Sequence, residues 1–289
     1  MTTTTLPTAP EAAPAATPSG AGKDASAIRL SAAGLIRSEW IKLRSVRSTV
    51  WSYALLVVFS LGLAAIMSAS LDLQGADVSM VPAANQATFV AQASTFGVFF
   101  GQLIVAVLGV LTISGEYSTG MIRSTLAAVP NRLPALWAKS AVLFTTTVLV
   151  GLVSTVGSYL VSSAVLSGKG LHAGLFDPAV LFPVLGGALY LGLIAVFALG
   201  IGTIVRSGAG GIAVVLGIVL LVPLVLQMIP AAWATSLLPY LVSNAGINMV
   251  GLMSFSQVPI EWWVDLLVVL GWLAAGLAGA AVLLKRRDA

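Results

Sequence analysis

VLFPVLGGALYLGLIAVFALGIGTIV is the sequence of residues Val180–Val205, and none of its side chains carries a charge. A helix of about 20 mostly apolar residues is long enough to cross the hydrocarbon core of a bilayer. The run is too long for a single β-strand, and it does not alternate apolar and polar residues with a period of two. It therefore predicts a transmembrane helix rather than a strand of a membrane barrel.

Five further stretches of the chain share this apolar character and this length. They are Val50–Leu71, Phe96–Ser114, Ser140–Leu166, Gly211–Ile229 and Val264–Leu284. Together with Val180–Val205 they make six expected spans. The expected fold class is an all-α integral membrane protein built as a six-helix transmembrane bundle.

The composition of the whole chain supports a membrane protein. Of its 289 residues, 58% are hydrophobic and only 8% are charged, whereas a soluble domain carries about 25% charged residues. Lipid must therefore be the main solvent for its surface. The chain has no cysteine and a single histidine, His172, which excludes disulfides, thiolate metal sites and histidine clusters.

The positions of the basic residues predict how the spans are oriented. Every Lys and Arg except Lys169 falls in the terminal segments or in the second and fourth connections. Cytoplasmic loops of membrane proteins are enriched in Lys and Arg. Both termini are therefore expected in the cytoplasm of a protein of the cell (inner or plasma) membrane. The net charge of +4 then reflects orientation, and no nucleic-acid partner is expected.

Residues 1–27 are rich in Thr, Ala and Pro and lack an apolar run after a basic start. They do not form a secretory signal peptide. Such a segment offers too little apolar surface to offset the entropy of ordering, which predicts a disordered cytoplasmic tail. A docking tail is the alternative. Residues 28–289 are the expected transmembrane domain.

Residues 30–49 form a basic, amphipathic segment ahead of the first span. On a helical wheel an apolar side and a basic side separate, which predicts a helix lying in the cytoplasmic interface with Trp40 at headgroup level. Its cations would favour anionic lipids. The alternative is a simple topology determinant. The apolar side holds Ala33, Ile36, Trp40, Leu43 and Val50, and the other side holds Arg37, Arg44, Ser45 and Ser48.

The second connection is the most informative stretch outside the spans. It reads GEYSTGMIRSTLAAVPNRLP over residues 115–134. Ser118 or Thr119 can cap a short helix, in which Met121, Ile122 and Leu126 make an apolar ridge. Pro130 ends that helix, and Pro134 favours the start of the next. A short apolar-faced helix exposed to the cytosol predicts a partner groove, or else a helix folded back on the bilayer.

The first and the last of the expected outer connections differ in polarity. Residues 230–263 are apolar but are interrupted by prolines at 230, 239 and 259, which predicts short helices that dip into the outer leaflet or cap the bundle. Residues 72–95 are polar and are expected to be a plain connection. Small-residue ridges, Gly97/Gly101 and Gly271/Ala275/Gly279, predict close helix contacts, within one chain or between two.

No catalytic motif is visible in the sequence. The only Gly-Lys steps, at Lys23 and Lys169, are not followed by Ser or Thr, so neither is a phosphate-binding loop. His172 lies near Asp177 in an expected outer loop. A histidine in such a loop is usually solvated, so we do not expect a catalytic role for it. We therefore expect a protein that is not an enzyme, with no metal and no cofactor of its own.

Two motifs resemble a known family. The run from Ser38 to Thr49, SEWIKLRSVRST, is similar to the N-terminal segment of actinobacterial type-2 ABC exporter permeases. The run from Gly115 to Leu126, GEYSTGMIRSTL, followed by Pro130, resembles the segment after their second span. The resemblance extends over essentially the whole chain, including the six spans and the long last outer loop.

This resemblance implies a division of labour. Such permeases work with a separate cytosolic ATPase subunit, two permeases and two ATPases forming the exporter, and ATP and Mg²⁺ bind only to the ATPase. The second permease is a copy of the chain or a homologous chain. The segment after the second span supplies a coupling helix, here Ser118–Val129, that enters a groove of the ATPase. The interfacial helix lies on the membrane and also contacts the ATPase.

The resemblance also assigns candidate site residues. The ATPase-coupling residues are Glu116, Tyr117, Ser118, Thr119, Gly120, Met121, Ile122, Arg123, Ser124, Thr125 and Leu126. The interfacial-helix residues are Arg37, Glu39, Trp40, Lys42, Leu43, Arg44 and Arg47.

The expected function is export of an amphiphilic drug, lipid or peptide. The pathway would be lined by apolar side chains with scattered Ser, Thr, Asn and Gln, such as Thr145, Thr146, Thr147, Ser154 and Ser158. Two other functions remain open. One is an ATP-independent secondary carrier, although the spans lack the mid-membrane acid that such carriers commonly use. The other is a non-transporting membrane scaffold or immunity protein.

Overall fold

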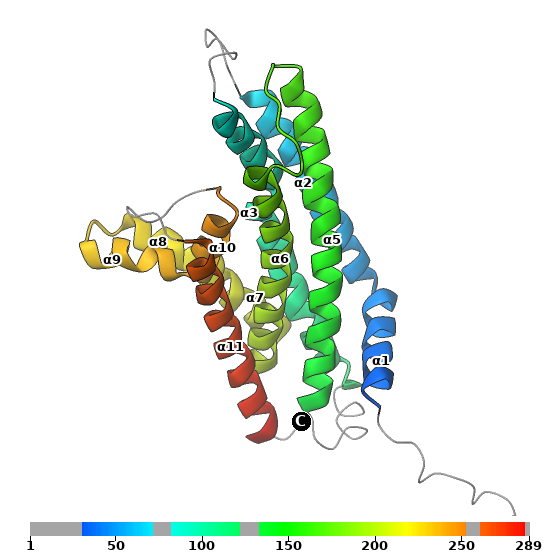
Figure 1. The fold of residues 1–289 in the computed structure, drawn as a ribbon. Coiled ribbons are helices and arrows are strands. Elements are labelled where there is room, and N and C mark those ends of the chain that lie inside the picture. Colours follow the sequence, from blue (N-terminus) through cyan, green and yellow to red (C-terminus); the bar gives the residue numbers. More distant parts are fainter. Residues whose placement is uncertain (1–30, 72–81, 122–132, 253–260, 287–289) are drawn as a thin grey trace, which may run out of the picture.

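The structure is a computed structural model that describes residues 31–71, 82–121, 133–252 and 261–286. Within these ranges every regular element is a helix (Figure 1). The tail predicted for residues 1–27 lies outside them. The elements are α1 (Ala32–Ser45), α2 (Arg47–Ser70), α3 (Ala83–Ser118), α5 (Leu133–Ser167), α6 (Pro178–Val205), α7 (Gly208–Leu216), a π-helix η3 (Gly217–Leu221), α8 (Val222–Met228), α9 (Ala232–Leu237), a 3₁₀ turn η4 (Leu238–Tyr240), α10 (Val242–Met249) and α11 (Trp262–Arg286).

Six helices are long and apolar enough to cross a membrane, which confirms the predicted number of spans. They are α2, α3, α5, α6, the continuous rod of α7, η3 and α8, and α11. Because six is an even number, α1 and the last turn of α11 lie at the same end of the bundle (Figure 1). We call this end the α1 end.

The second and third spans are much longer than their apolar cores. α3 begins at Ala83 rather than Phe96, and α5 begins at Leu133 rather than Ser140. The expectation that residues 83–95 form a plain connection is therefore wrong. Ala87, Val90 and Ala91 are buried in a small cluster with residues of α5 and α6, so packing, not lipid, extends the helix there.

α6 is the central helix of the bundle. It contacts α3, α5, α7, α10 and α11, and Tyr190, Ile194 and Phe197 are fully buried along it. Glycines of α6 lie where neighbouring helices pass closest to it. A side chain at Gly200, for example, would lie 3.0 Å from the backbone of Gly276 in α11. Small residues at such crossings let helix backbones approach closely.

The Gly97/Gly101 ridge of the second span packs within the chain. A Cβ atom at Gly97 would lie 2.6 Å from the Cα of Ser60, and one at Gly101 would lie 2.8 Å from the side chain of Leu56. Both neighbours belong to α2. This contact resolves the alternatives for that ridge in favour of packing between the first two spans. In the sixth span, by contrast, Gly271 has no neighbour within 4 Å among the described residues.

The fifth span changes its winding half-way. Residues Gly217–Leu221 form a π-helix between α7 and α8. Pro223, the second residue of α8, has no backbone N–H to donate to the preceding turn. A wider turn accommodates the missing hydrogen bond, and π-helical turns are frequent at functional sites.

The long loop after the fifth span folds into short helices, as the prolines predicted. Three contacts hold α10 and the preceding turn η4 against the bundle. Gly246 packs against the ring of Tyr190 so closely that a side chain has no room. Asn248 Nδ2 donates to Asp265 Oδ2 at 2.7 Å, and Trp272 Nε1 donates to the carbonyl of Tyr240 at 2.9 Å. The segment therefore caps one side of α6 and α11.

The amphipathic segment is two helices rather than one. α1 starts at Ser31, whose hydroxyl accepts from the backbone N–H of Gly34, and it ends at Val46, which is extended at φ −83° and ψ 116°. The prediction of one helix over residues 30–49 is therefore wrong beyond Ser45. Val50 belongs to α2 and does not share a face with Trp40.

Lys169, the one Lys or Arg away from the α1 end among the residues that the structure describes, caps a helix. Its Nζ donates to the carbonyl oxygens of Ser68, Ala69 and Leu71 at 2.9, 2.7 and 2.7 Å. These groups end α2, where unpaired carbonyls favour a cation. Asp177 similarly caps α6, because its carboxylate accepts from the N–H of Ala179. Local helix-end chemistry therefore accounts for both residues.

Candidate functional site: a buried ion ring between three helices

Three helices meet at the α1 end of the bundle, and each brings charged side chains to the junction. Glu39 and Lys42 come from α1, Glu116 from the last turn of α3, and Lys139 from the second turn of α5. A spacing of three residues places Glu39 and Lys42 on the same face of α1. We call the four side chains the ion ring.

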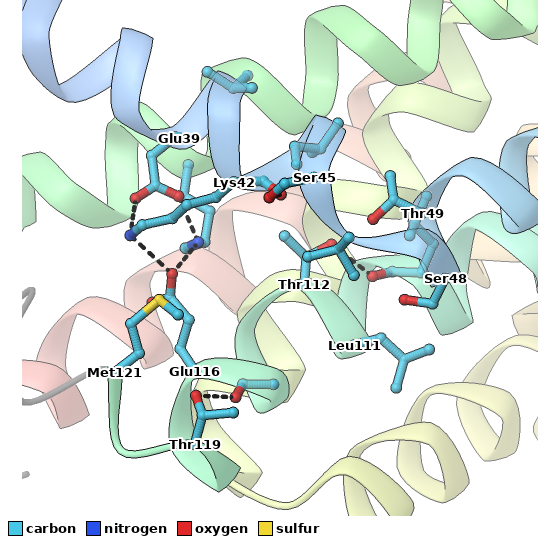
Figure 2. Close-up of a pocket in the computed structure, with 16 residues that line it drawn as sticks. Glu39, Lys42, Ser45, Ser48, Thr49, Leu111, Thr112, Glu116, Thr119 and Met121 are labelled. Atoms are coloured by element: carbon cyan, nitrogen blue, oxygen red, sulfur yellow. Dashed lines mark hydrogen bonds and ion pairs between the residues drawn. The ribbon is translucent and has the colours of Figure 1, made fainter.

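Each ammonium group bridges the same two carboxylates. Lys139 Nζ lies 2.5 Å from Glu39 Oε2 and 2.8 Å from Glu116 Oε1. Lys42 Nζ lies 2.7 Å from Glu39 Oε1 and 3.0 Å from Glu116 Oε1. Figure 2 shows Glu39, Lys42 and Glu116 turned toward one another across the junction. With two Glu and two Lys, the formal charges of the ring cancel.

The ring is removed from solvent. Glu39 and Lys139 are each 5% exposed, and Glu116 is 6% exposed. An ion buried without a partner costs several kcal/mol, so each charge depends on the others. Separating α1, α3 or α5 would leave buried charges unpaired. The ring therefore holds these three helices in one arrangement.

Lys42 is the one partly exposed member. Burial lowers the pKa of its ammonium, but the hydrogen bonds and charges of Glu39 and Glu116 more than offset this, so the pKa lies above the usual 10.5. A raised lysine pKa means that its stabilising contribution is complete at neutral pH and is lost only as pH rises through the raised value. Lys42 therefore stays charged at neutral pH.

The end of α3 has a second link, on its other side. The guanidinium carbon of Arg206 lies 5.5 Å from the centre of the Tyr117 ring, a cation–π contact. Arg206 ends α6 in a left-handed conformation, with φ at 58°, just before α7 begins. Neighbouring residues of α3 thus connect to different helices: Glu116 to α1 and α5, and Tyr117 to the α6–α7 turn.

The structure places part of the predicted coupling segment. Glu116, Tyr117 and Ser118 are the last residues of α3 itself. Ser118 and Thr119 do not start a new helix, because both hydroxyls donate back to the carbonyl of Gly115. Gly120, with φ at 72°, ends α3. Met121 is the last residue of the described range 82–121, and Ile122, Arg123, Ser124, Thr125 and Leu126 lie outside the described ranges.

The interfacial-helix candidates fall into two groups. Glu39, Lys42 and Leu43 face the bundle, whereas Arg37, Trp40, Arg44 and Arg47 are exposed. The wheel placed Leu43 beside Ile36 and Trp40, but those two are 47% and 45% exposed. The face that packs on the bundle is thus centred on a carboxylate, which an apolar wheel does not detect.

Lys139 is the functional residue that the sequence reasoning missed. It was counted among the basic residues that set the topology, yet it lies at the centre of the ring. The available signal was its position shortly after Pro134, which favours a helix start, and just before the long apolar run that the sequence predicts as a span. A lone charge in that setting needs a partner.

A cavity of about 350 Å³ adjoins the ring. It lies between α1, the first turn of α2, the end of α3 and the start of α5. Figure 2 shows Glu39, Lys42 and Glu116 at one end and Ser48, Thr49, Leu111 and Thr112 at the other. We call it the junction cavity.

A second cavity of about 270 Å³ lies between α3, the fifth span and α10. Its walls are mostly apolar, including Phe99 and Pro223, with Gln102, Gln227, Ser243 and Asn244 as polar members. Gln102 is held in place by the hydroxyl of Tyr190, which donates to its Oε1 at 2.5 Å. The cavity adjoins the π-helical turn.

Three of the hydroxyls predicted to line a pathway make hydrogen bonds within the bundle. Thr147 pairs with the hydroxyl of Tyr53 at 2.8 Å, and Thr146 and Ser154 donate to carbonyls of their own helix. None of the predicted lining residues belongs to the two cavities described above. The position of a pathway along α5 therefore stays a prediction.

Comparison with known proteins decides the family. A family model described as "ABC-2 family transporter protein" matches residues 35–223, a range that runs from α1 to the fifth span and contains the whole ion ring. The chain belongs to the ABC-2 transporter family. No curated protein matched the sequence.

Membership in the ABC-2 family gives the coarse function. The chain is a multi-pass membrane protein and a permease subunit of an ABC transporter. Permeases of this family are transport components that work with an ABC ATPase partner in general. The ion ring and the two cavities are therefore features of the membrane half of such a transporter.

Proposed function

We propose that this permease exports an amphiphilic substrate from the cytoplasm when its α1 end is driven by a separate ATPase subunit. The observation that carries the proposal is the ion ring. It joins the helix that precedes the first span, the end of the second and the start of the third at one point. A push on the segment after α3 would then move three membrane helices together.

The coupling residues are the stretch from Glu116 to Leu126. Its first residues continue α3 without a break, so a force on the following residues acts on a helix that crosses the whole bundle. Tyr117 carries part of that force to Arg206 at the α6–α7 turn. Rigid-body movement of packed helices is a common form of switching, and here the ring defines which helices move as a unit.

The orientation follows from the charge pattern. The α1 end carries exposed Arg37, Arg44 and Arg47, and Lys285 and Arg286 end α11 at the same end. Positive residues favour the cytoplasmic side, so we assign the α1 end to the cytoplasm and the α9–α10 segment to the outside. In this orientation α1 lies in the cytoplasmic interface, with Trp40 at headgroup depth.

The second cavity is the best candidate for a substrate contact. Its mostly apolar wall with a few polar groups is typical of small-molecule sites. It lies beside the π-helical turn of the fifth span and beneath α10, so a movement of either element would change its shape. A substrate must bind the two arrangements differently for transport to do work. These features support a drug, lipid or peptide of amphiphilic character.

The assembly we infer has two ATPase subunits and two permeases, the second being another copy or a homologue. ATP and Mg²⁺ would bind to the ATPase subunits. The chain itself would contribute no cofactor site and no catalytic residue.

The experiment is to disturb the coupling segment and measure assembly, ATP hydrolysis and export together. Ile122→Glu and Leu126→Glu place a charge on the predicted apolar ridge, and Arg123→Glu reverses the nearby charge. Loss of one buried anchor at an interface commonly costs about 2 kcal/mol, a fall in affinity of about 30-fold. We expect the protein to fold while substrate-stimulated ATP hydrolysis and export in vesicles are lost.

The matched control is Ser124→Glu, since Ser124 falls opposite Ile122 on a helical wheel. This variant should keep assembly and export close to wild type. Normal assembly and export in the Ile122 and Leu126 variants would refute the coupling assignment. Export that continues without the ATPase but collapses with a proton uncoupler would instead identify a secondary carrier.

A further inference from the structure

The described residues that line the second cavity carry no charge. They come from α3, η3, α8 and α10, and none of them is Asp, Glu, Lys, Arg or His. Asp265 of α11 accepts from Asn248 of α10, but neither of these two residues lines the cavity. An ion in the cavity would therefore lose its hydration without gaining a counter-charge from the wall, which is unfavourable.

Two amide side chains of the wall are held rigidly. Gln102 of α3 is fixed at both polar atoms, since its Nε2 donates to the carbonyl of Phe99 at 2.9 Å and its Oε1 accepts from the hydroxyl of Tyr190. Asn244 of α10 is fixed through its Nδ2, which donates to the carbonyl of Leu238 at 2.9 Å. Both side chains are only 3% exposed. This part of the wall is therefore set before any ligand binds.

The third amide, Gln227, is not held in this way. It lines the cavity from α8 and is exposed. No described residue hydrogen-bonds to its side chain. Because α8 belongs to the fifth span, this amide lies in a helix that is expected to be surrounded by lipid, where a polar group without a partner is unfavourable. Gln227 is therefore available to a ligand.

The chemistry of the wall selects one class of ligand. A side-chain amide both donates and accepts hydrogen bonds, so an amide group in the ligand can match it in both senses. An ammonium group only donates, and it brings a charge that nothing in the wall balances. The apolar part of the lining, which includes Phe99, Leu103 and Pro223, suits an aliphatic or aromatic body.

We propose that the second cavity binds uncharged amphiphiles that carry an amide group, such as the backbone of an apolar peptide, and discriminates against organic cations. Gln227 hydrogen-bonds to the amide of the ligand and determines this specificity, while Gln102 and Asn244 keep the shape of the polar wall. The inference rests on the proposed export function, whose substrate class it narrows.

The test compares two probes that share one apolar skeleton. They are phenylbutylamine, a primary ammonium at neutral pH, and its N-acetyl derivative, an uncharged amide. The purified full-length protein is reconstituted in phosphatidylcholine nanodiscs, and saturable binding of each tritiated probe is measured by equilibrium dialysis against protein-free nanodiscs. We expect the amide to bind at least about tenfold more tightly, because only the ammonium gives up the hydration of a charge.

Two variants of Gln227 and one control test the specificity. Gln227→Leu removes the free amide and should weaken binding of the amide probe severalfold without affecting the ammonium probe. Gln227→Glu places a carboxylate on the wall and should shift the preference toward the ammonium by about tenfold. Ser167→Glu adds the same charge at an exposed position near the end of α5, which does not line the cavity, and should leave the preference unchanged.

A second pair of variants locates the bound probe. Leu103→Trp enlarges a side chain of the cavity wall and should abolish saturable binding of the amide probe. Leu149→Trp introduces the same side chain at a position of α5 that is 56% exposed, and this control should bind the amide probe as the wild type does.

The proposal would be overturned if the wild-type protein bound the amide no more tightly than the ammonium, or showed no saturable binding of the amide. A preference that Gln227→Glu does not shift, or that Ser167→Glu shifts as far, would contradict the role of Gln227. Amide binding that survives Leu103→Trp would place the site elsewhere and also overturn the proposal. The measurement uses neither ATP nor a partner subunit, so it can fail while export and its coupling variants behave as expected.

Discussion

At the scale of single residues, the charges buried at the α1 end are paired with one another. Glu39, Glu116 and Lys139 are buried where α1, α3 and α5 meet, and replacing such a set by apolar side chains is often neutral or stabilising in other proteins. Its presence here is therefore poor evidence for stability alone. We interpret it as a device that fixes which helices stay together.

Removing one member should be far more costly than removing a pair. Lys139→Met leaves Glu39 and Glu116 buried with only Lys42 between them, so we expect a loss of about 3 to 5 kcal/mol. The double variant Lys139→Met/Glu39→Met retains the Lys42–Glu116 pair and should recover most of that loss. Thermal unfolding of the purified proteins in detergent, followed by tryptophan fluorescence, measures both.

Equal unfolding temperatures for wild type and Lys139→Met would show that the ring does not hold the helices. The same conclusion would follow if the double variant were less stable than the single one. Thr145→Met, at an exposed position of the same helix, is the control for introducing methionine into α5.

At the scale of helices, apolar length predicted the six spans well but predicted their ends poorly. Hydropathy detects where lipid surrounds a helix. It does not detect that α3 continues outward to Ala83, because there Ala87 and Val90 are covered by protein. It likewise could not separate α1 from α2, since the break at Val46 is a local change of backbone conformation. Prolines were better guides, and they predicted the short helices after the fifth span.

The α10 helix gives a prediction at this scale. Gly246 lies against the ring of Tyr190, whose hydroxyl is tied to Gln102, so the ring has little freedom to move aside. Gly246→Ala should therefore destabilise the docking of α10 by about 1 to 3 kcal/mol. The unfolding midpoint in detergent measures this.

Gly271→Ala in α11 is the matched control. A Cβ atom there meets nothing within 4 Å among the described residues, and alanine favours a helix over glycine by up to about 1 kcal/mol. It should be neutral or slightly stabilising. If the two alanine variants behaved alike, the packing of α10 on α6 would be contradicted.

At the scale of the whole molecule, the sequence predicts the orientation of the bundle, whereas only the structure shows which charged residues are paired inside it. The distribution of Lys and Arg predicted that one end of the bundle is basic. It could not show that Lys139 is withdrawn from that surface to pair with Glu116, since pairing depends on three helices far apart in the chain. The two cavities also arise only from this packing. The family resemblance implied the importance of Glu116 but not its partners.

The central claim is that the α1 end, where α3 runs into the coupling segment, faces the cytoplasm and its ATPase. Because the natural chain has no cysteine, one introduced thiol can be labelled cleanly. Ser118→Cys marks the exposed end of α3, and His172→Cys marks an exposed position just beyond the far end of α5. A membrane-impermeant maleimide is applied to intact and to permeabilised cells.

We predict that Cys introduced at position 172 reacts in intact cells and that Cys introduced at position 118 reacts only after permeabilisation. Labelling of position 118 in intact cells would place the coupling segment outside the cell, where no ATPase subunit could reach it, and would contradict the account.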